Sequence, residues 1–184
     1  MKFFYIILLV IVLIFCTGFS EPVADISVSY QPNTDRLETL FKASLPIKSG
    51  IMYTKVPRGL IVSINEKYFF NEGETKIKES SLCLLDIIAE LLVKLSNYCV
   101  VEDHTDEFLN GEDNWELSLL RASNIVDYLI TYEKIPASQL FSLGYGQSMP
   151  FRDNVSSKKN GLDSRIDFVI LQYDVKRWCF DEVL

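Results

Sequence analysis

The sequence predicts an α/β protein, with helices packed on one face of a small mixed sheet in a two-layer α+β sandwich. Short apolar runs typical of buried strands alternate with longer segments in which apolar residues recur every three or four positions, as on one face of a helix. With 184 residues, 48% of them hydrophobic, the chain has room for one ordinary domain and its core.

These patterns predict four strands and two long helices. We expect strands at 60–64, 99–102, 140–143 and 165–173, and helices at about 73–97 and 113–132. The second helix opens with the sequence Asp-Asn-Trp-Glu, a good capping-box pattern. The expected order of strands and helices defines one domain at 56–174.

The N-terminal segment 1–20 has the pattern of an export signal. One lysine precedes an apolar run from Phe3 to Phe15, and small residues follow, so cleavage before Glu21 is expected. A bilayer span needs about 20 apolar residues, which makes retention as a membrane anchor the less favoured alternative. Lipidation of Cys16 is a third alternative for this segment. All three alternatives place the rest of the chain in a bacterial periplasm, with attachment at the outer membrane favoured over the inner membrane.

Two segments flank the expected domain. Residues 21–55 are rich in Ser, Thr, Pro, Asp and Lys without a sustained period, which favours a tether, with weak support for a short helix at 36–43. Residues 175–184 form a tail whose Trp178 and Phe180 are candidates for docking on the domain or on a partner protein.

Charge and cysteine usage narrow the function classes. A net charge of −7 excludes nucleic acid as a partner, since phosphates require clustered Lys and Arg. Cys83 and Cys99 lie at opposite ends of an expected helix, over about 20 Å apart at 1.5 Å per residue, too far for a disulfide. A bond from Cys179 to either one and small buried thiols remain the alternatives.

The most informative segment is 101–122. His104-Thr105-Asp106 ends an apolar strand, Asn114 opens the next helix, and Arg121 follows three residues after Ser118. An acid on a loop and an arginine on the helix could hold a small zwitterion, with carboxylate facing ammonium and guanidinium facing carboxylate. Taken alone, the same pair is an ordinary surface salt bridge, worth about 0.5 kcal/mol.

Several ordered sequence blocks, which include this segment, resemble those of a known family over about Val56 to Gln172. The signature block is joined upstream by Phe70 and Gly73 and downstream by residues 135–140, Gly144-Tyr145-Gly146, Pro150 and Asn154. In this order the blocks resemble the OmpA-like peptidoglycan-binding domain. Two departures stand out. Asp103 replaces the glycine before His-Thr-Asp, and Asp163-Ser164-Arg165-Ile166 replaces Asn-Arg-Arg-Val, with the loss of one arginine.

The resemblance implies a binding site for the diaminopimelate of the peptidoglycan stem peptide. Asp106 would accept hydrogen bonds from the ligand ammonium, and Arg121 would face a carboxylate. Thr105 and Asn114 would add hydrogen bonds, with Asn71 and Arg165 at the rim.

The implied function is non-covalent attachment of an envelope protein or complex to the cell wall. The alternative is a structural subunit of an envelope-spanning machine such as a secretion apparatus, which uses the fold for protein contacts. Trp115, Tyr145 and Phe151 are candidate contact aromatics for that role. A proton-driven motor stator needs an acid inside its membrane helix, and the run at 3–15 has none.

Catalysis, cofactors and metals are not expected. His104 is the only histidine, and no marked serine or cysteine nucleophile accompanies it. A zinc site needs three or four protein ligands, and no second His or Cys pair lies nearby in the sequence. Asp103 and Asp106 are expected to face solvent, which does not favour an acid pair for glycan cleavage. His104 is therefore interpreted as structural.

Overall fold

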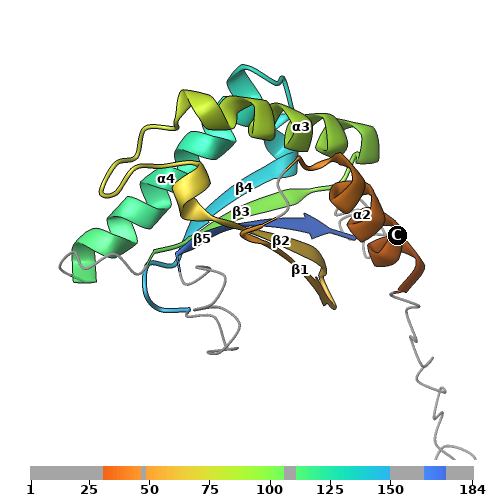
Figure 1. Ribbon diagram of the computed structural model, residues 1–184, viewed down its shortest axis with the longest axis horizontal. Helices are drawn as coiled ribbons and strands as arrows, with labels where there is room; N and C mark the ends of the chain where they lie inside the picture. Colours follow the sequence, from red (N-terminus) through yellow and green to blue (C-terminus); the bar gives the residue numbers. More distant parts are fainter. Residues whose placement is uncertain (1–30, 47–48, 106–110, 150–163, 173–184) are drawn as a thin grey trace, which may run out of the picture.

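The computed structural model describes residues 31–46, 49–105, 111–149 and 164–172, and within them it has a five-stranded mixed sheet with the helices on one face (Figure 1). This confirms the predicted fold class. The strands are β1 Ile51–Val56, β2 Gly59–Asn65, β3 Cys99–His104, β4 Leu140–Gly144 and β5 Arg165–Leu171. The four strands expected from the sequence correspond to β2, β3, β4 and β5.

Three helices cover the sheet, α2 Gln31–Ser44, α3 Glu79–Leu95 and α4 Gly111–Thr131, with 3₁₀ turns η1 Glu66–Tyr68 and η2 Ala137–Gln139. The two long helices expected from the sequence are α3 and α4. Helix α3 begins later than expected because the chain turns back first, and Lys78 N–H donates to the carbonyl of Phe69. It ends at Ser96, whose left-handed backbone (φ 54°) stops the helix.

The strand order is β1-β2-β5-β3-β4, so the last strand in the chain lies at the centre of the sheet. Only β3 and β4 pair in parallel, while the other neighbours are antiparallel. In the β3–β5 register Glu102 lies opposite Asp167 and His104 opposite Arg165. Residues opposite one another share a face of the sheet, so these four side chains gather on one side.

The hydrophobic core lies between the helices and one face of the sheet. The residues of β5 alternate, and Ile166, Phe168 and Ile170 enter this core together with Leu85 and Ile88 of α3. Each large side chain removed from water in this way contributes about 1.5–3 kcal/mol. The other face of β3 and β5 carries the side chains of Glu102, His104, Arg165 and Asp167, so polar groups are concentrated there.

The segment 21–55 differs from the expected tether, because its described part contains α2 and β1. Leu37, Phe41 and Leu45 of this segment are buried in the core. Lys55 of β1 forms an ion pair with Glu38 of α2 at 2.9 Å and a second with Asp35. The folded unit therefore extends to α2, well before the expected boundary at residue 56. Apolar residues four positions apart place one face of α2 against the sheet.

Other expectations concern cysteines and membrane attachment. Cys99 is buried as a small thiol, whereas Cys83 is exposed, and both are free. Among the described residues no helix combines the length and apolar content required to cross a bilayer. Cys16, Cys179, the apolar run at 3–15 and the tail at 175–184 lie outside the described residues.

Candidate functional site

Arg121 lies on α4 with its side chain fully buried, so it is not a surface residue. Its Nε donates to the carbonyl oxygen of Glu74 at 2.7 Å, and its Nη2 donates to the carbonyl oxygen of Asn71 at 3.0 Å. Both acceptors belong to the loop between η1 and α3. The guanidinium thus fixes this loop against α4, and it uses backbone acceptors whose positions depend little on residue type.

The counter-charge of Arg121 is Glu66, the first residue of η1. Arg121 Nη1 lies 2.9 Å from Glu66 Oε1, and the side chains of the pair are 0% and 4% exposed. A fourth contact, at 3.4 Å, reaches Thr105 Oγ1 just beyond β3, and the guanidinium lies 5.2 Å from the centroid of the Phe70 ring. Removing one partner from such a buried pair leaves an uncompensated charge, so the two residues stabilise the fold as a unit.

The structure places Thr105 and Asn71 against Arg121, near the middle of α4, and Asn114 on the same helix. Thr105 is buried and contacts Arg121 directly. Asn114 is buried two helical turns before Arg121. Asn71 contributes its backbone carbonyl, while its amide donates to Glu74 at 2.8 Å. Asp106 lies outside the described residues, so its part in ligand binding stays a prediction.

Ser118 holds the start of α4 against the chain after β4. Its hydroxyl donates to the carbonyl of Trp115 at 2.9 Å and accepts from the backbone N–H of Gly146 at 2.9 Å. A Cβ on Gly146 would lie 3.2 Å from the backbone of Trp115, and the residue has a φ of +49°. This close approach requires a small residue, so Ser118 and Gly146 position the helix that carries Arg121.

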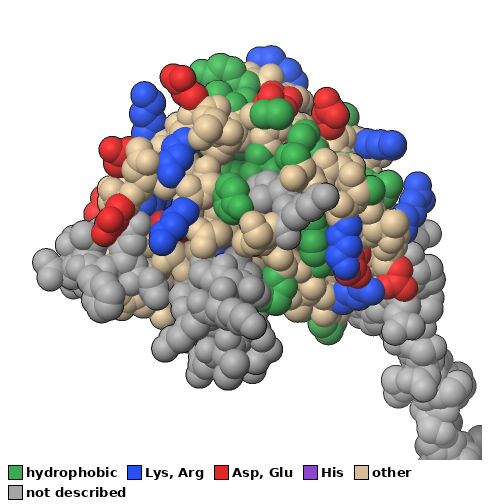
Figure 2. Space-filling model, in the orientation of Figure 1, with side chains coloured by type: hydrophobic (Ala, Val, Ile, Leu, Met, Phe, Trp, Pro, Cys, Tyr) green, Lys and Arg blue, Asp and Glu red, His purple; other side chains and the backbone are tan. Residues whose placement is uncertain are grey.

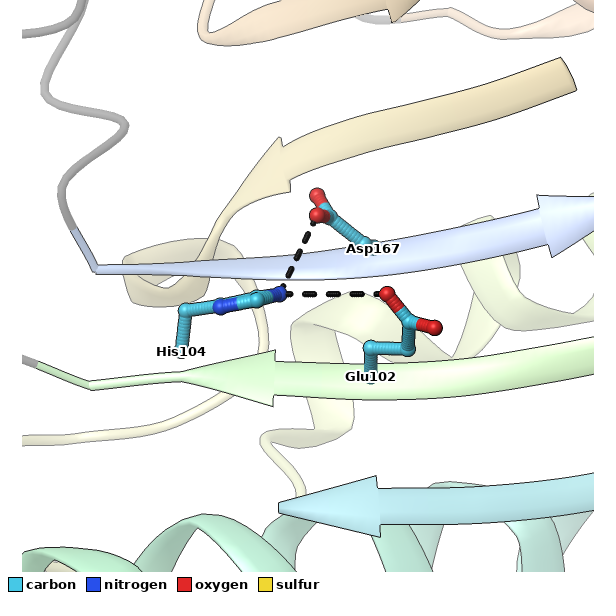
Figure 3. Close-up of side chains that lie close together, drawn as sticks. All are labelled: Glu102, His104 and Asp167. Carbon is cyan, nitrogen blue, oxygen red and sulfur yellow. Dashed lines mark ion pairs between the residues drawn. The ribbon is translucent and has the colours of Figure 1, made fainter. Parts of the chain in front are cut away.

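Arg165, predicted at the ligand rim, belongs instead to a second polar cluster on the sheet face opposite the helices. Its Nε donates to Asp167 Oδ2 at 3.1 Å, and its Nη2 lies 3.4 Å from the carbonyl of Met149. His104 Nε2 lies 3.2 Å from the same Asp167 oxygen and 4.0 Å from Glu102 Oε2 (Figure 3). Alternation along β3 and β5 separates this cluster from the core side of the sheet.

Glu102, His104 and Asp167 have the composition of a metal site, since one donor atom from each lies within 4.8 Å of the others. The sequence argument missed this grouping because Asp167 is distant along the chain and adjacent only through the β3–β5 register. Both carboxylates already have arginine partners, Arg58 at 3.0 Å from Glu102 and Arg165 at 3.1 Å from Asp167. A divalent cation would add positive charge to a cluster whose carboxylates are already neutralised by arginines. We therefore assign the cluster a structural role.

His104 and Asp167 form the centre of this structural cluster. His104 stacks on Tyr145 at a ring separation of 4.9 Å. Burial by itself would raise the pKa of Asp167, but the hydrogen bond with His104 and the charge of Arg165 hold that pKa below its usual value.

The position of Asp103 differs from the one expected from the sequence. It was expected to face solvent, yet it is fully buried, and its carbonyl accepts a hydrogen bond from Tyr145 N–H at 2.9 Å. It lies opposite the core residue Ile166 in the register, so its side chain is on the helix side of the sheet. A carboxyl group therefore lies in place of the family glycine, on the helix side of the sheet, where Arg121 also lies.

Glu66 is the residue of the site that the sequence analysis did not identify. It lies 55 positions before Arg121, and the acceptors beside it are backbone carbonyls that leave no residue signature. An available signal was an acidic residue directly after an otherwise apolar buried strand, since a charge at such a position needs a partner.

Fold and site together define a small α/β domain with a buried arginine at the centre of its candidate site. The chain belongs to the OmpA family, which it matches over residues 69–162. It is 31% identical over 128 residues to the uncharacterized protein YtxE of Bacillus subtilis, covering 67% of this chain and 53% of YtxE. It is 30% identical to motility protein B of the same organism, over 61% of this chain and 45% of that protein. It is 28% identical to a peptidoglycan-associated lipoprotein of Rhizobium meliloti, over 59% of this chain and 61% of that protein. The chain thus spans about half the length of the first two relatives.

Solved structures agree on the fold. A putative MotB-like protein from Desulfovibrio vulgaris superposes with a TM-score of 0.66 at 19% identity, over 80% of this chain and 93% of the other. The cell wall anchor of the type VI secretion system from Pseudomonas aeruginosa gives 0.59 at 19% identity, over 77% and 98%. At 19% identity these structural matches establish the fold alone.

Proposed function

We propose that this protein binds peptidoglycan non-covalently, through the diaminopimelate of the stem peptide, and anchors an envelope structure to the cell wall without catalysis. Membership of the OmpA family carries the proposal, because the matched range 69–162 contains the complete His-Thr-Asp and Leu-Ser-x-x-Arg-Ala signature. One relative, from Rhizobium meliloti, is a peptidoglycan-associated lipoprotein.

The geometry supports the proposed roles of Asp106 and Arg121. Thr105 Oγ1 lies 3.4 Å from the guanidinium of Arg121, and Asp106 is the next residue along the chain. Asp106 itself lies outside the described residues, so its contact with the ligand is part of the proposal. An acid and an arginine suit a ligand that carries an ammonium and a carboxylate on the same carbon, as diaminopimelate does.

The proposed location is the bacterial periplasm, with the domain at the cell wall and the membrane reached through the N-terminal segment or a lipid on Cys16. Charge is consistent with this assignment, since the face in Figure 2 mixes acidic and basic side chains without a basic cluster for nucleic acid. Envelope proteins that the wall-bound domain would hold in place are its proposed partners.

Co-sedimentation of the full-length protein with purified diaminopimelate-type peptidoglycan tests the proposal. Wild type is expected in the pellet, and Asp106→Ala in the supernatant, because the ligand ammonium loses its carboxylate. Asp127→Ala is the matched control, since it removes an exposed aspartate that belongs to α4 and lies outside the proposed ligand-binding residues. Parallel samples without peptidoglycan correct for self-association through the apolar N-terminus. Peptidoglycan with lysine at the third position should bind less, because it lacks the second carboxylate.

The alternative function, a protein-interaction subunit, has one specific observation in its favour. Trp115 and Phe141 are 59% and 47% exposed, so two large aromatic side chains are available for contact with a partner. Of the other candidate contact aromatics, Tyr145 is half-buried against His104 and Phe151 lies outside the described residues. If the wild-type protein stays in the supernatant with every peptidoglycan, this alternative replaces the wall-anchor proposal.

A further inference from the structure

The charge of Arg121 is neutralised before any ligand arrives. Glu66 Oε1 lies 2.9 Å from Arg121 Nη1, and water is excluded from both side chains. Asp103 is a second fully buried carboxyl group on the helix side of the sheet. The surroundings of Arg121 are therefore not an open positive pocket, although an arginine is the residue expected to attract the ligand carboxylate.

We propose that Glu66 determines ligand specificity at this site by selecting a zwitterion over a simple anion. The proposal rests on the wall-binding function above and deepens it. A simple carboxylate would bring an uncompensated negative charge next to the Glu66–Arg121 pair, where desolvation is costly and attraction to the guanidinium is already offset. A ligand that carries its own ammonium adds no net charge, so the pair does not repel it as a whole.

Glu66 has a position suited to this role. It begins η1, its backbone N–H donates to the carbonyl of Ser164 at 3.2 Å, and its carbonyl accepts from Phe69 and Phe70. The backbone contacts fix its carboxylate beside Arg121, so the negative charge stays in place when a ligand arrives. Glu66 acts through Arg121 and is a positioning residue in this sense.

The substitution Glu66→Gln separates charge from shape. Glutamine has nearly the same size and retains a carbonyl oxygen that can accept from Arg121 Nη1, but it removes the negative charge. The guanidinium then has excess positive charge, and anions without an ammonium are expected to bind better. The matched control is Glu102→Gln, because Glu102 is equally buried at 3% exposure and also pairs with an arginine, at 3.0 Å, in the cluster on the other sheet face.

The ligands are meso-diaminopimelate and pimelate, which have the same seven-carbon dicarboxylate chain with and without the two amino groups. Isothermal titration of the full-length protein should show wild type binding diaminopimelate at least tenfold more tightly than pimelate, roughly one step of 1.4 kcal/mol. Glu66→Gln should bind pimelate about tenfold more tightly than wild type does and so narrow the ratio. Glu102→Gln should keep the wild-type ratio.

The outcomes are distinguishable. A Glu66→Gln protein that is folded by circular dichroism and keeps the wild-type ratio, or that loses affinity for both ligands, overturns the role of Glu66 and leaves wall binding intact. Wild type that binds neither ligand nor peptidoglycan overturns both proposals. If Glu66→Gln does not fold, the Arg121 side-chain N–H resonances of wild type decide. They should shift with diaminopimelate and not with pimelate at equal concentration, and equal shifts reject the inference.

Discussion

Gly144, the last residue of β4, lies directly against the backbone of Leu119 in α4. A Cβ added to Gly144 would lie 2.4 Å from the Leu119 nitrogen and 2.7 Å from the hydroxyl oxygen of Ser118. Atoms cannot approach so closely, so a side chain here requires the helix to move. Because Arg121 follows two residues after Leu119 on α4, this contact also sets the position of the candidate site.

The first prediction concerns Gly144→Ala. The added methyl group must push α4 away from β4, and overpacking of this kind costs about 3 kcal/mol in the free energy of unfolding. Urea denaturation measures the loss. Leu143→Ala is the control, since this neighbouring side chain is 41% exposed and its removal should cost less than about 1 kcal/mol. Equal losses in the two variants would show that the close contact is not important.

The second prediction concerns the buried pair Glu66–Arg121. Arg121→Met should lower the free energy of unfolding by about 4 kcal/mol, because it leaves the buried Glu66 without its counter-charge. Adding Glu66→Leu should restore part of that loss, since the unpaired carboxylate is then gone. A double-mutant cycle from urea denaturation gives the coupling. Effects that add within about 0.5 kcal/mol would mean that the two residues do not interact.

The third prediction is a pH dependence that originates from Asp167. Its pKa is lowered in the folded protein, so its carboxylate contributes stability above the unfolded value of about 3.9, and this contribution is lost as pH falls through the folded pKa. The free energy of unfolding of wild type should therefore fall more steeply below about pH 4 than that of Asp167→Asn. Parallel curves for the two proteins from pH 7 to 2 would contradict this.

The fourth prediction tests whether α2 belongs to the folded domain. Phe41 is fully buried in the core, so Phe41→Ala should cost about 3–5 kcal/mol in the free energy of unfolding. Lys42→Ala changes the next residue, whose side chain is 55% exposed, and should cost less than about 1 kcal/mol. If both substitutions cost equally little, α2 packs too weakly to count as part of the domain.

The parts of the fold that the sequence predicted are those with a strong apolar period. Strands β2, β3 and β5 have continuous runs buried on both faces or nearly so, and α3 and α4 have apolar residues at helical spacing. Helix α2 has few apolar residues among many polar ones, and only Leu37 and Phe41, four positions apart, mark its buried face, with Leu45 directly after the helix. Strand β1 is a half-buried edge strand without clear alternation, so the sequence favours a tether over 21–55 and predicts only a weakly supported short helix at 36–43, which corresponds to part of α2.

The residues of the candidate site also fall into those that the sequence predicted and those that it did not. Thr105, Asn114 and Arg121 were predicted because a sequence signature marks them, and Thr105 and Arg121 are in contact. The role of Glu66 and the separation of Arg165 from Arg121 could not be predicted, because both follow from tertiary pairing. Glu66 reaches Arg121 across 55 positions, and the register of β5 with β3 directs Arg165 toward Asp167 on the other sheet face.

The central place of β5 has a consequence for when the domain folds. β2 and β3 pair with each other only through β5, which begins at Arg165, near the end of the chain. A nascent chain that lacks this strand has two separate strand pairs and half of a core, too little to remain folded. The domain can therefore become stable only once β5 has been synthesised and has inserted between β2 and β3, so its folding is a late event for the nascent chain.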